Sequence, residues 1–511
     1  MSYQSAAGRW VLAIAVLGSG LALLDSTVVN VALPDIGRDL HASTSTLQWI
    51  LNGYLLTLAS LILLGGSLGD RYGRRRIFVF GTTLFTASSL LCAIAPNAEL
   101  LVAARLLQGV GGALLTPGSL AMIESSFRPA DRSRAIGAWS GLGGVAAALG
   151  PLVGGYLVGA VSWRAIFLIN LPIGVFVVLM APRHVPETRD PTASGHLDFP
   201  GAVLAALGLA GVTYALIEAP GQGLSPSILL TGIGGLAAFA AFLATERRSA
   251  NPMLPLSMFS SRQFSAANGV TFVVYAALGG VFFLLVSFLQ ISLGYSPIEA
   301  GAASLPITVL MLLLSARSGA LAQRIGARVP LTVGPLVIAA GLLLMTRIQV
   351  GDSYVSSVLP AVIVFGLGLT LVVAPVTATV LAAADERHLG MASGVNNAVA
   401  RVAGLLAVAV LPVIAGLTGE KFYDPSAMVD GFHVAMVACA GLAAAGAILA
   451  WLTISSEVLE VEPEPGGSSP AEVLGQFSCG VGGTPMRPGR EAADAPADVA
   501  RLGRTKEAQL A

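Results

Sequence analysis

The most informative scarcity in this sequence is that of charge. Aspartate, glutamate, lysine and arginine together make up 11% of the 511 residues, whereas 55% are hydrophobic. A soluble domain carries roughly twice that share of charged residues. The core of a soluble domain could not bury as much apolar surface as this chain has. The composition therefore excludes an ordinary soluble protein and indicates that a lipid bilayer surrounds most of the chain.

Lysine and cysteine are scarce as well. Lysine occurs only at Lys421 and Lys506 and the net charge is zero, so no basic surface for nucleic acid is expected. The three cysteines, Cys92, Cys439 and Cys479, lie far apart, which argues against a disulfide framework or a metal site. The sequence also lacks the GxxxxGK(S/T) loop that holds nucleotide phosphates, so ATP-driven transport is disfavoured and no cofactor is expected.

Apolar runs close to the length that crosses a bilayer recur along the chain as far as Trp451. We predict fourteen transmembrane helices: a first group of six, an inserted pair and a last group of six. Their predicted ranges are 10–32, 48–68, 77–95, 100–123, 135–158, 164–181, 199–218, 228–245, 267–290, 297–317, 329–348, 357–381, 394–417 and 431–453.

The distribution of arginine supports this number of spans, because cytoplasmic loops of membrane proteins are enriched in basic residues. One predicted side holds only Arg38, Arg164, Arg347 and Lys421. With an even number of spans, we expect a protein of the cell membrane with both termini in the cytoplasm. The other, arginine-rich side contains Arg9, Arg71, Arg74, Arg75, Arg76, Arg128, Arg132, Arg134, Arg183, Arg189, Arg247, Arg248, Arg262, Arg317, Arg324, Arg328 and Arg387.

Two changes in composition suggest a division into domains. After Trp451 the chain becomes rich in Glu, Pro, Gly and Ser, which predicts a disordered cytoplasmic tail. A polar stretch from Pro182 to Pro200 separates the first six spans from the inserted pair. We predict an N-terminal six-helix bundle (1–182), linkers with two inserted helices (183–262), a C-terminal six-helix bundle (263–455) and the tail (456–511).

The loop between the second and third spans combines glycines, one carboxylate and several cations. Glycines let two helices and a turn pack closely, and the carboxylate can pair with arginine or with a helix N-terminus, contacts that a moving bundle makes and breaks. A simple topology signal is the alternative. The segment resembles motif A of the major facilitator superfamily, GxLaDrxGrkxxl, which implies a cytoplasmic gate that includes Gly66, Gly69, Asp70, Arg71, Gly73, Arg74 and Arg75.

A weaker copy of this loop follows the tenth span, from Gly319 to Arg328, with Gln323 in place of the aspartate. Internal repeats of this kind are typical of transporters whose two bundles rock about a site at the midplane. The expected fold class is an all-α polytopic membrane protein with the major facilitator fold and two inserted helices, which works by alternating access. Only the first loop, which contains the aspartate, is expected to hold the cytoplasmic side closed.

The fourth predicted span contains a charged residue, Arg105, on the same helical face as Gln108 and Gly112. An arginine inside a bilayer is costly, so it normally faces the bundle interior and has a partner. An arginine that extends to the outer interface is the alternative. The run from Arg105 to Gly112 resembles motif B of the same superfamily, RxxqGxgaa, which implies a role in proton coupling.

The first span supplies a candidate partner for Arg105. Asp25 lies about 22 Å along its helix from Trp10, and Arg105 lies about 7 Å into its span from the far side of a core about 30 Å thick. The depths agree, so we predict that the two side chains face each other. In this hypothesis Asp25 takes and releases the proton, and Arg105 favours its charged form until substrate intervenes. A polar residue at a helix end, without mechanistic weight, is the alternative.

The stretch from Leu24 to Pro34 also selects a branch of the superfamily. It resembles the lDxTvvnvALP signature of the fourteen-helix drug:proton antiporters. Together with the motif B run, it leads us to predict a substrate cavity that includes Asn30, Gln108 and Gly112.

The fifth span is rich in glycine around one proline. Pro151 removes the backbone hydrogen bond to Ala147 and bends the helix, while small residues allow close contact with another helix. Packing without directional meaning is the alternative. The cluster resembles motif C, gxxxGPxxGG, which the family associates with export, and it predicts a hinge made by Gly141, Gly150, Pro151, Gly154 and Gly155.

Further polar residues lie near the predicted cytoplasmic ends. The resemblance implies that Asp70 approaches the N-terminus of the thirteenth span when the cytoplasmic side is closed, because the helix dipole there favours a carboxylate. For Glu124 a solvated surface position is the alternative. The remaining gate candidates are Glu124, Arg134, Asn397 and Arg401.

These patterns together predict a proton-coupled antiporter that exports drugs, antibiotics or other small lipophilic compounds. The alternatives are a uniporter, a sensor or an exporter of an endogenous metabolite with the same fold. A membrane enzyme is disfavoured, because the five histidines are scattered over loops and span edges on both sides. The expected partners are a small-molecule substrate, protons and the lipid bilayer, and the sequence does not indicate whether an accessory efflux protein is needed.

Overall fold

The computed structural model describes residues 1–189, 197–249, 252–384 and 389–459. Within these ranges, fourteen helical segments are long and apolar enough to cross a membrane, which confirms the predicted number of spans. The helices are α1 (Ala6–Asp39), α2 (Thr44–Tyr72), α3 (Arg74–Ala93), α4 (Ala98–Ser126), α5 (Pro129–Ala160), α6 (Ala165–Leu168), α7 (Asn170–His184), α8 (Phe199–Gln222), α9 (Pro226–Arg248), η1 (Leu256–Ser260), α10 (Arg262–Ile291), α11 (Pro297–Ala303), α12 (Leu305–Ile325), α13 (Arg328–Met345), η2 (Tyr354–Val358), α14 (Leu359–Ala382), α15 (Leu389–Ile414), η4 (Gly419–Phe422), α16 (Pro425–Thr453) and η5 (Ser456–Leu459).

Polar N-cap residues fix where several spans begin. The Ser43 side chain accepts a hydrogen bond from the Thr46 N–H, and the Asn97 side chain accepts one from the Leu100 N–H at 2.9 Å. Such caps satisfy backbone N–H groups that have no partner within the helix. The serine and asparagine at these positions therefore explain why the chain re-enters the membrane there.

Three of the fourteen spans consist of two helical pieces. The breaks fall at Ile169, at Ser304 and at the junction of η2 with α14, each within three residues of a proline. A proline has no N–H to donate to the carbonyl four residues earlier, so the regular hydrogen-bond pattern stops one turn before it. The prolines are Pro172, Pro306 and Pro360.

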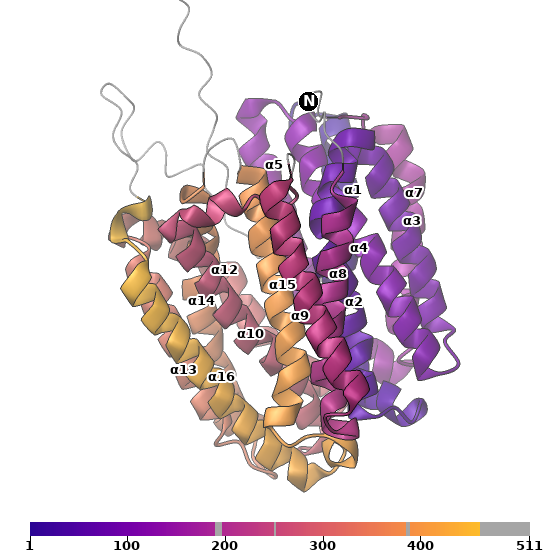
Figure 1. Cartoon of the computed structure of the whole chain (residues 1–511), viewed down its shortest axis with the longest axis vertical. Helices are drawn as coiled ribbons and strands as arrows, with labels where there is room; N and C mark the ends of the chain where they lie inside the picture. The colour runs from indigo at the N-terminus through magenta and orange to yellow at the C-terminus, as the bar shows by residue number, and fades with distance from the viewer. Residues whose placement is uncertain (190–196, 250–251, 385–388, 460–511) are drawn as a thin grey trace, which may run out of the picture.

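The spans form two bundles with an inserted pair between them (Figure 1). Helices α1–α7 make the first bundle and α10–α16 the last. We call the boundary where the two bundles meet the seam, and α8 packs there on both α2 and α15. The Trp49 indole N–H donates to the Glu218 carboxylate at 2.9 Å, which ties α2 to α8. This arrangement is the predicted one, two six-helix bundles plus two inserted helices.

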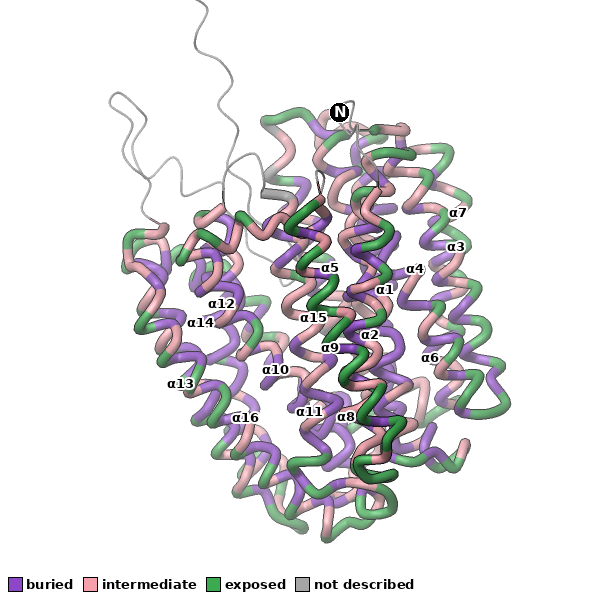
Figure 2. Tube along the Cα trace, viewed as in Figure 1, coloured by how far each residue is buried: buried purple, intermediate pink, exposed green. Residues whose placement is uncertain are grey.

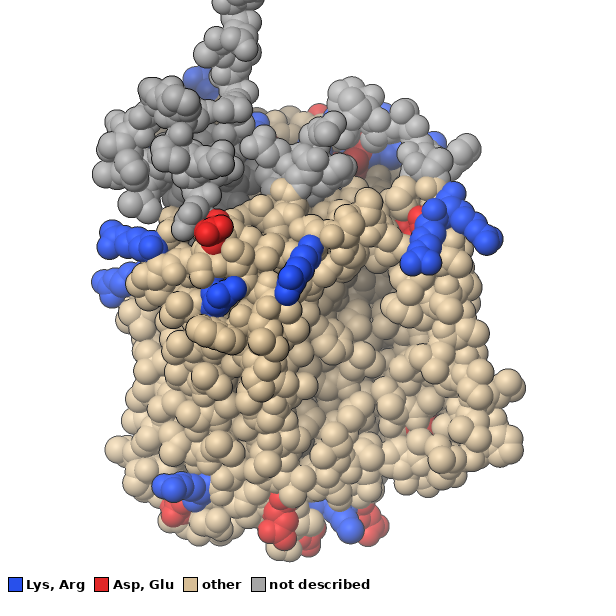
Figure 3. Space-filling view, turned by 60° about the vertical axis from the view of Figure 1, so that its left-hand side comes forward, with Lys and Arg blue, Asp and Glu red and all other residues tan. Residues whose placement is uncertain are grey.

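The outer surface of the described helices is apolar. Leu230 and Ile233 of α9 are 75% and 64% exposed, and Figure 2 shows exposed residues along the outward sides of α9, α13 and α16. Figure 3 shows charged side chains gathered at the two ends of the molecule, with a broad uncharged band between them. An apolar band of this kind is stable only against lipid tails, so the protein is a multi-pass membrane protein.

The two bundles meet closely at one end of the molecule. We call the end where α1 begins the N-terminal face, and the end where α1 finishes the opposite face. At the opposite face the Tyr423 hydroxyl donates to the Ala42 carbonyl at 2.6 Å, and burial raises the pKa of this hydroxyl to about 12, so it stays a donor. The side chains of Gln48 and Gln290 donate to the carbonyls of Val408 and Val31, at 2.6 and 2.9 Å. The opposite face is therefore closed.

The start of the predicted tail needs a correction. Residues Ser456–Leu459 form η5, and Val458 and Leu459 pack against the hydrophobic core of the last bundle. The Arg328 side chain donates to the Ile454 carbonyl at 2.7 Å and fixes the chain just before η5. These four residues thus belong to the folded part. Residues 460–511 of the predicted tail lie outside the described residues, and the other domain boundaries stay predictions.

Candidate functional site

A cluster of polar side chains lies inside the first bundle. It comprises Asp25 of α1, Ser89 of α3, Arg105 and Gln108 of α4, and Asn170 of α7, none of them more than 1% exposed. Buried polar groups are costly unless hydrogen-bonded, and buried charges more so. Four helices therefore converge on one polar site in an otherwise apolar bundle.

The predicted contact between Asp25 and Arg105 is present. One Arg105 terminal nitrogen pairs with Asp25 Oδ2, and the Arg105 Nε–H donates to the Ile50 carbonyl at 3.0 Å. The guanidinium also lies 4.5 Å from the centre of the Tyr54 ring, a cation–π contact. Arg105 is thus held from three sides and does not extend to the membrane surface.

The other Asp25 oxygen accepts two amide donors. Gln108 Nε2 and Asn170 Nδ2 donate to Asp25 Oδ1 at 2.9 and 3.2 Å. Both amides also reach Ser89 Oγ, at 2.8 and 3.2 Å. Oδ1 thus accepts two donors and Oδ2 one, so Oδ2 is the oxygen with a lone pair left for a proton.

Sequence reasoning missed Asn170 and Ser89 as partners of Asp25. Both are neutral and lie in separate spans, and only the fold brings them together. Asn170 precedes Pro172 at the break between α6 and α7. The sequence signal that could have identified Asn170 is a polar amide within an apolar span.

The remaining predicted cavity residues lie nearby. Asn30 donates to the Ser26 carbonyl of its own helix at 3.3 Å, and Gly112 faces the Tyr54 ring. Their assignment, with Gln108, to a substrate cavity stays a prediction.

The motif A loop folds around one ion pair. Asp70 pairs with Arg74 one turn away, at 2.8 and 2.9 Å, and Arg71 lies over the Tyr72 ring. Gly73, between α2 and α3, has a φ of 115°, a conformation that side chains disfavour. Gly66 lies against Pro117 of α4, and Gly69 approaches only Arg74. The loop thus positions Asp70 at the N-terminal face.

A further residue that sequence reasoning missed, Glu187, covers the start of α3. Its Oε1 accepts the Arg75 backbone N–H at 3.1 Å, and its Oε2 lies 3.5 Å from Arg75 Nε and 3.7 Å from Arg76 Nε. The Arg75 side chain also donates to the Val185 carbonyl at 2.9 Å. A carboxylate at a helix N-terminus is stabilised by the helix dipole. The segment after α7 therefore packs on the motif A loop and the start of α3.

We expect Gly73→Ala to lower the stability of the protein by about 1–3 kcal/mol, because a non-glycine residue is strained at this φ. A methyl group there would also lie 2.6 Å from Glu187 Oε1. The second change Glu187→Ala should then recover only the steric part of the loss. The measurement is thermal unfolding of the purified protein. Gly69→Ala is the matched control, and an equal loss in both glycine variants would contradict this account.

The other gate candidates differ in how close they lie to this loop. Glu124 is within electrostatic range of Arg74 and Asp70, whereas the structure places Arg134 on the Tyr3 ring, 4.4 Å from its centre. Asn397 is exposed and donates to the Ser393 carbonyl of its own helix at 3.2 Å. The residues just before α15 lie outside the described ranges, so the approach of Asp70 to this helix stays a prediction, as do the gate roles of Asn397 and Arg401.

The glycine-rich part of α5 contacts both bundles. Gly150 packs on Thr27 of α1 and Gly154 on Val28 of the same helix. Across the seam, Gly155 lies against the Pro297 carbonyl of α11, and Gly301 of α11 lies against the Pro151 carbonyl. Helix α5 continues through Pro151, and Gly141 has open space around it. Small residues thus let α5 join the two bundles at the opposite face, while its role as a hinge stays a prediction.

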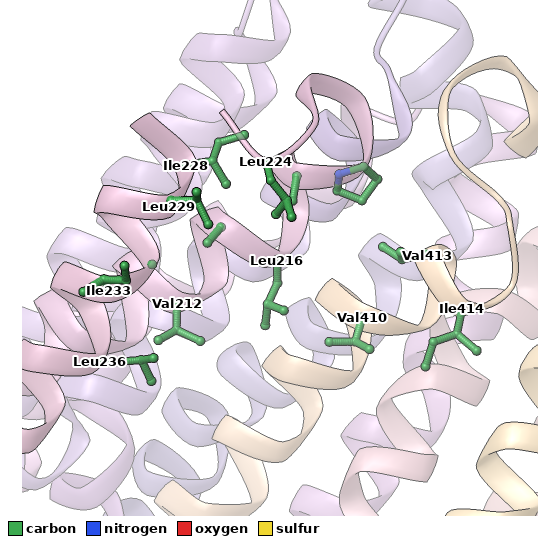
Figure 4. Close-up of a pocket in the computed structure, with 14 residues that line it drawn as sticks. Val212, Leu216, Leu224, Ile228, Leu229, Ile233, Leu236, Val410, Val413 and Ile414 are labelled. Carbon is green, nitrogen blue, oxygen red and sulfur yellow. The ribbon is translucent and has the colours of Figure 1, made fainter. Parts of the chain in front are cut away.

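An apolar groove lies on the outside of the seam, between α8, α9 and α15 (Figure 4). Its volume is about 430 Å³, and its lining is aliphatic, with Leu216, Ile228, Val410 and Ile414 among the residues. It offers no polar group that would orient a ligand. The groove is therefore apolar in character and separate from the polar site described above.

The sequence matches known transporters over most of its length. The family profile described as Major Facilitator Superfamily matches residues 15–408. The chain is 36% identical over 456 residues to the methylenomycin A resistance protein of Bacillus subtilis (strain 168). This alignment covers 88% of this chain and 96% of that protein. It is 36% identical over 419 residues to the tetracenomycin C resistance and export protein of Streptomyces glaucescens, covering 81% and 77%. It is 35% identical over 476 residues to the puromycin resistance protein pur8 of Streptomyces alboniger, covering 90% and 94%.

Solved structures show the same fold at low sequence identity. A peptide transporter POT in complex with sulfate has a TM-score of 0.62 and 15% identity, covering 88% of this chain and 96% of that chain. The human organic anion transporter MFSD10 (TETRAN) has a TM-score of 0.57 and 18% identity, covering 88% and 100%. These likenesses establish the architecture and leave the substrate open.

Proposed function

This chain belongs to the major facilitator superfamily, and from that premise we propose that it exports drugs, antibiotics or similar small lipophilic compounds in exchange for protons. The names of its relatives, resistance and export proteins for three antibiotics, support the export of such compounds. The observation that carries the proton-coupled part is the buried Asp25–Arg105 pair, because a titratable group inside a membrane is expensive and marks a proton or substrate path.

The proposed orientation places the N-terminal face in the cytoplasm. The helix ends at this face include Arg74, Arg247 and Arg328, whereas Arg164 and Arg347 lie at the opposite face. The bias follows the positive-inside rule. The closed seam at Tyr423 and Gln290 is then the extracellular gate, and the described conformation is the one that faces the cytoplasm.

The coupling step proposed here is an exchange of partners at Asp25. In the described state its carboxylate is neutralised by Arg105 and bonded by Gln108 and Asn170. Protonation removes the charge that holds Arg105, so the guanidinium loses its counter-ion while it stays bonded to the Ile50 carbonyl. Since Asp25 lies on α1 and Arg105 on α4, weakening their contact changes how these helices pack, and the bundles are free to reorient.

The test of this function is transport in everted membrane vesicles that contain the chain. A panel of lipophilic dyes with cationic, neutral and anionic members is offered, with and without a protonophore. Accumulation of at least one dye that the protonophore abolishes is the expected result. Accumulation that survives collapse of the gradient would favour the uniporter alternative instead.

Closing and opening of the seam should depend on the α5–α11 contact. We expect Gly155→Leu to reduce transport by at least about tenfold, because a leucine cannot fit against the Pro297 carbonyl while the opposite face is closed. The same leucine at Gly159, which lies on the same helix and has open space around it, should leave transport close to native.

Accessibility of the seam checks the cause. Cysteine is introduced at Gln290, whose side chain spans the seam to the Val31 carbonyl, in a chain that also carries Cys479→Ser. A water-soluble maleimide added from the opposite face should label this cysteine faster in Gly155→Leu than in Gly159→Leu. Equal labelling rates would show that Gly155 does not control the seam.

A further inference from the structure

A second arginine lies inside the membrane, and it has no counter-ion among the residues that the structure describes. Arg401 is twelve residues from the start of α15 and thirteen from its end, so each membrane surface is about 18–20 Å away along the helix. Its side chain cannot reach either surface. Among the described residues Arg401 makes no hydrogen bond or ion pair, and it is partly exposed. A cation at this depth normally has a partner.

The described acids offer Arg401 no partner at its depth. Asp25 is already neutralised by Arg105, and Glu218 bonds Trp49 at the opposite-face end of α8. The described acidic residues of the last bundle lie at helix ends, in the connecting loops or within two turns of a helix start. They are Glu299, Asp352, Glu420, Asp424, Asp430 and Glu457.

A tyrosine of the neighbouring helix α10 lies beside Arg401. Tyr275 lies midway along α10, within electrostatic range of Arg401, and like Arg401 it is partly exposed. The Asn396 side chain of α15 donates to the Thr271 hydroxyl of α10 at 2.9 Å, and Gly404 lies against Gly279, so Arg401 lies at the level of Tyr275. Among the described residues, a cation without an ion pair and a phenol thus lie at one depth, near the middle of the membrane.

From this juxtaposition we propose that Arg401, with Tyr275, binds the anionic group of the transported compound. The substrate class would be lipophilic acids, carboxylic or phenolic, with an apolar skeleton. Arginine supplies the charge and Tyr275 a hydroxyl donor, and charge-assisted hydrogen bonds of this kind are the strong ones. This inference rests on the proposed export function and names its substrate class.

The site is also placed to communicate with Asp25. Tyr54 carries Arg105 on its ring face and lies within electrostatic range of Arg401 as well. Its hydroxyl donates to the Ala22 carbonyl of α1 at 3.3 Å. An anion bound at Arg401 would therefore act on the same aromatic side chain that packs against the proton site, from the other side of the seam.

The test is equilibrium binding to the purified full chain in lipid nanodiscs, with no proton gradient. The probes are 1-pyrenebutyrate and 1-pyrenebutanamide, which share a skeleton and differ in charge. The native chain should bind the acid at least about tenfold more tightly than the amide. Arg401→Gln should remove this preference, and Arg401→Lys should keep most of it. Arg347→Gln, which removes an exposed arginine at the opposite face, is the control and should bind as the native chain does.

Three results would overturn the proposal: equal binding of acid and amide by the native chain, a preference that survives Arg401→Gln, or an equal loss of both probes in that variant. The last result would make Arg401 a structural residue. Because no gradient is present, the binding test is independent of proton coupling. Dye transport that does not need the gradient would contradict the proposed antiport but not the proposed anion site. Proton-coupled transport without a preference for the acid would contradict the anion site but not the antiport.

Discussion

Asp25→Asn is expected to reduce gradient-driven transport by at least about tenfold, since the loss of a titratable group removes the coupling between proton and substrate. The asparagine still offers an oxygen to Gln108 and Asn170, which now donate to Asp25 Oδ1. It cannot take up a proton, and it cannot neutralise Arg105. Asp25→Glu keeps the charge and the proton and should recover part of the transport.

The measurement uses everted vesicles with matched amounts of protein and a dye that the native chain accumulates. Asp39→Asn is the matched control, because Asp39 lies on the same helix and also pairs with an arginine, Arg164, but at the exposed opposite face. It should transport as the native chain does. Full, protonophore-sensitive transport by Asp25→Asn would contradict the proposed role of this carboxylate. Arg401 and Glu218 would then be the next residues to test.

The contact between Asp25 and Arg105 was predictable from sequence because it follows from depth and charge. Two ionisable residues in apolar spans are costly alone, and counting residues along straight helices places both at one depth. The count of spans was predictable for a related reason, since apolar runs and their polar caps are local in the sequence. Ser43 and Asn97 mark such starts.

The rest of the site depends on packing between spans, which no local pattern contains. Ser89 and Asn170 are neutral, so neither needed a partner in the way a charge does. Glu187 follows α7 by a few residues, yet it caps α3, because the chain folds back across the N-terminal face. Arg134, a predicted gate residue, lies 4.4 Å from the centre of the Tyr3 ring, a contact that depends on where the N-terminal segment folds.

The largest effect on stability is expected for the separation of Asp25 from Arg105. Removing one member of a buried ion pair leaves an uncompensated charge and costs about 3–5 kcal/mol. Arg105→Leu leaves the carboxylate alone, and Asp25→Asn leaves the guanidinium alone. The double variant leaves neither charge, so it should be destabilised by much less than the sum of the two single changes.

Unfolding of the purified chain in bicelles, followed by tryptophan fluorescence, measures this double-mutant cycle. Asp39 and Arg164 form the comparison pair, at 2.7 Å and with 48% and 36% of their side chains exposed. An exposed pair couples by only about 0–1 kcal/mol. A coupling between Asp25 and Arg105 no larger than this would mean that burial adds nothing to their interaction.

The size of the coupling also constrains the transport cycle. Protonation of Asp25 removes the same charge as Asp25→Asn, so the cycle approximates the free energy that protonation withdraws from the Arg105 contact. One proton crossing the membrane delivers about 2.3 kcal/mol for each 100 mV of potential, to which the pH difference adds. A coupling of about 3–5 kcal/mol is therefore of the size one proton can offset. In the proposed mechanism, a pair of this strength holds one packing of α1 on α4 and is released by a single protonation.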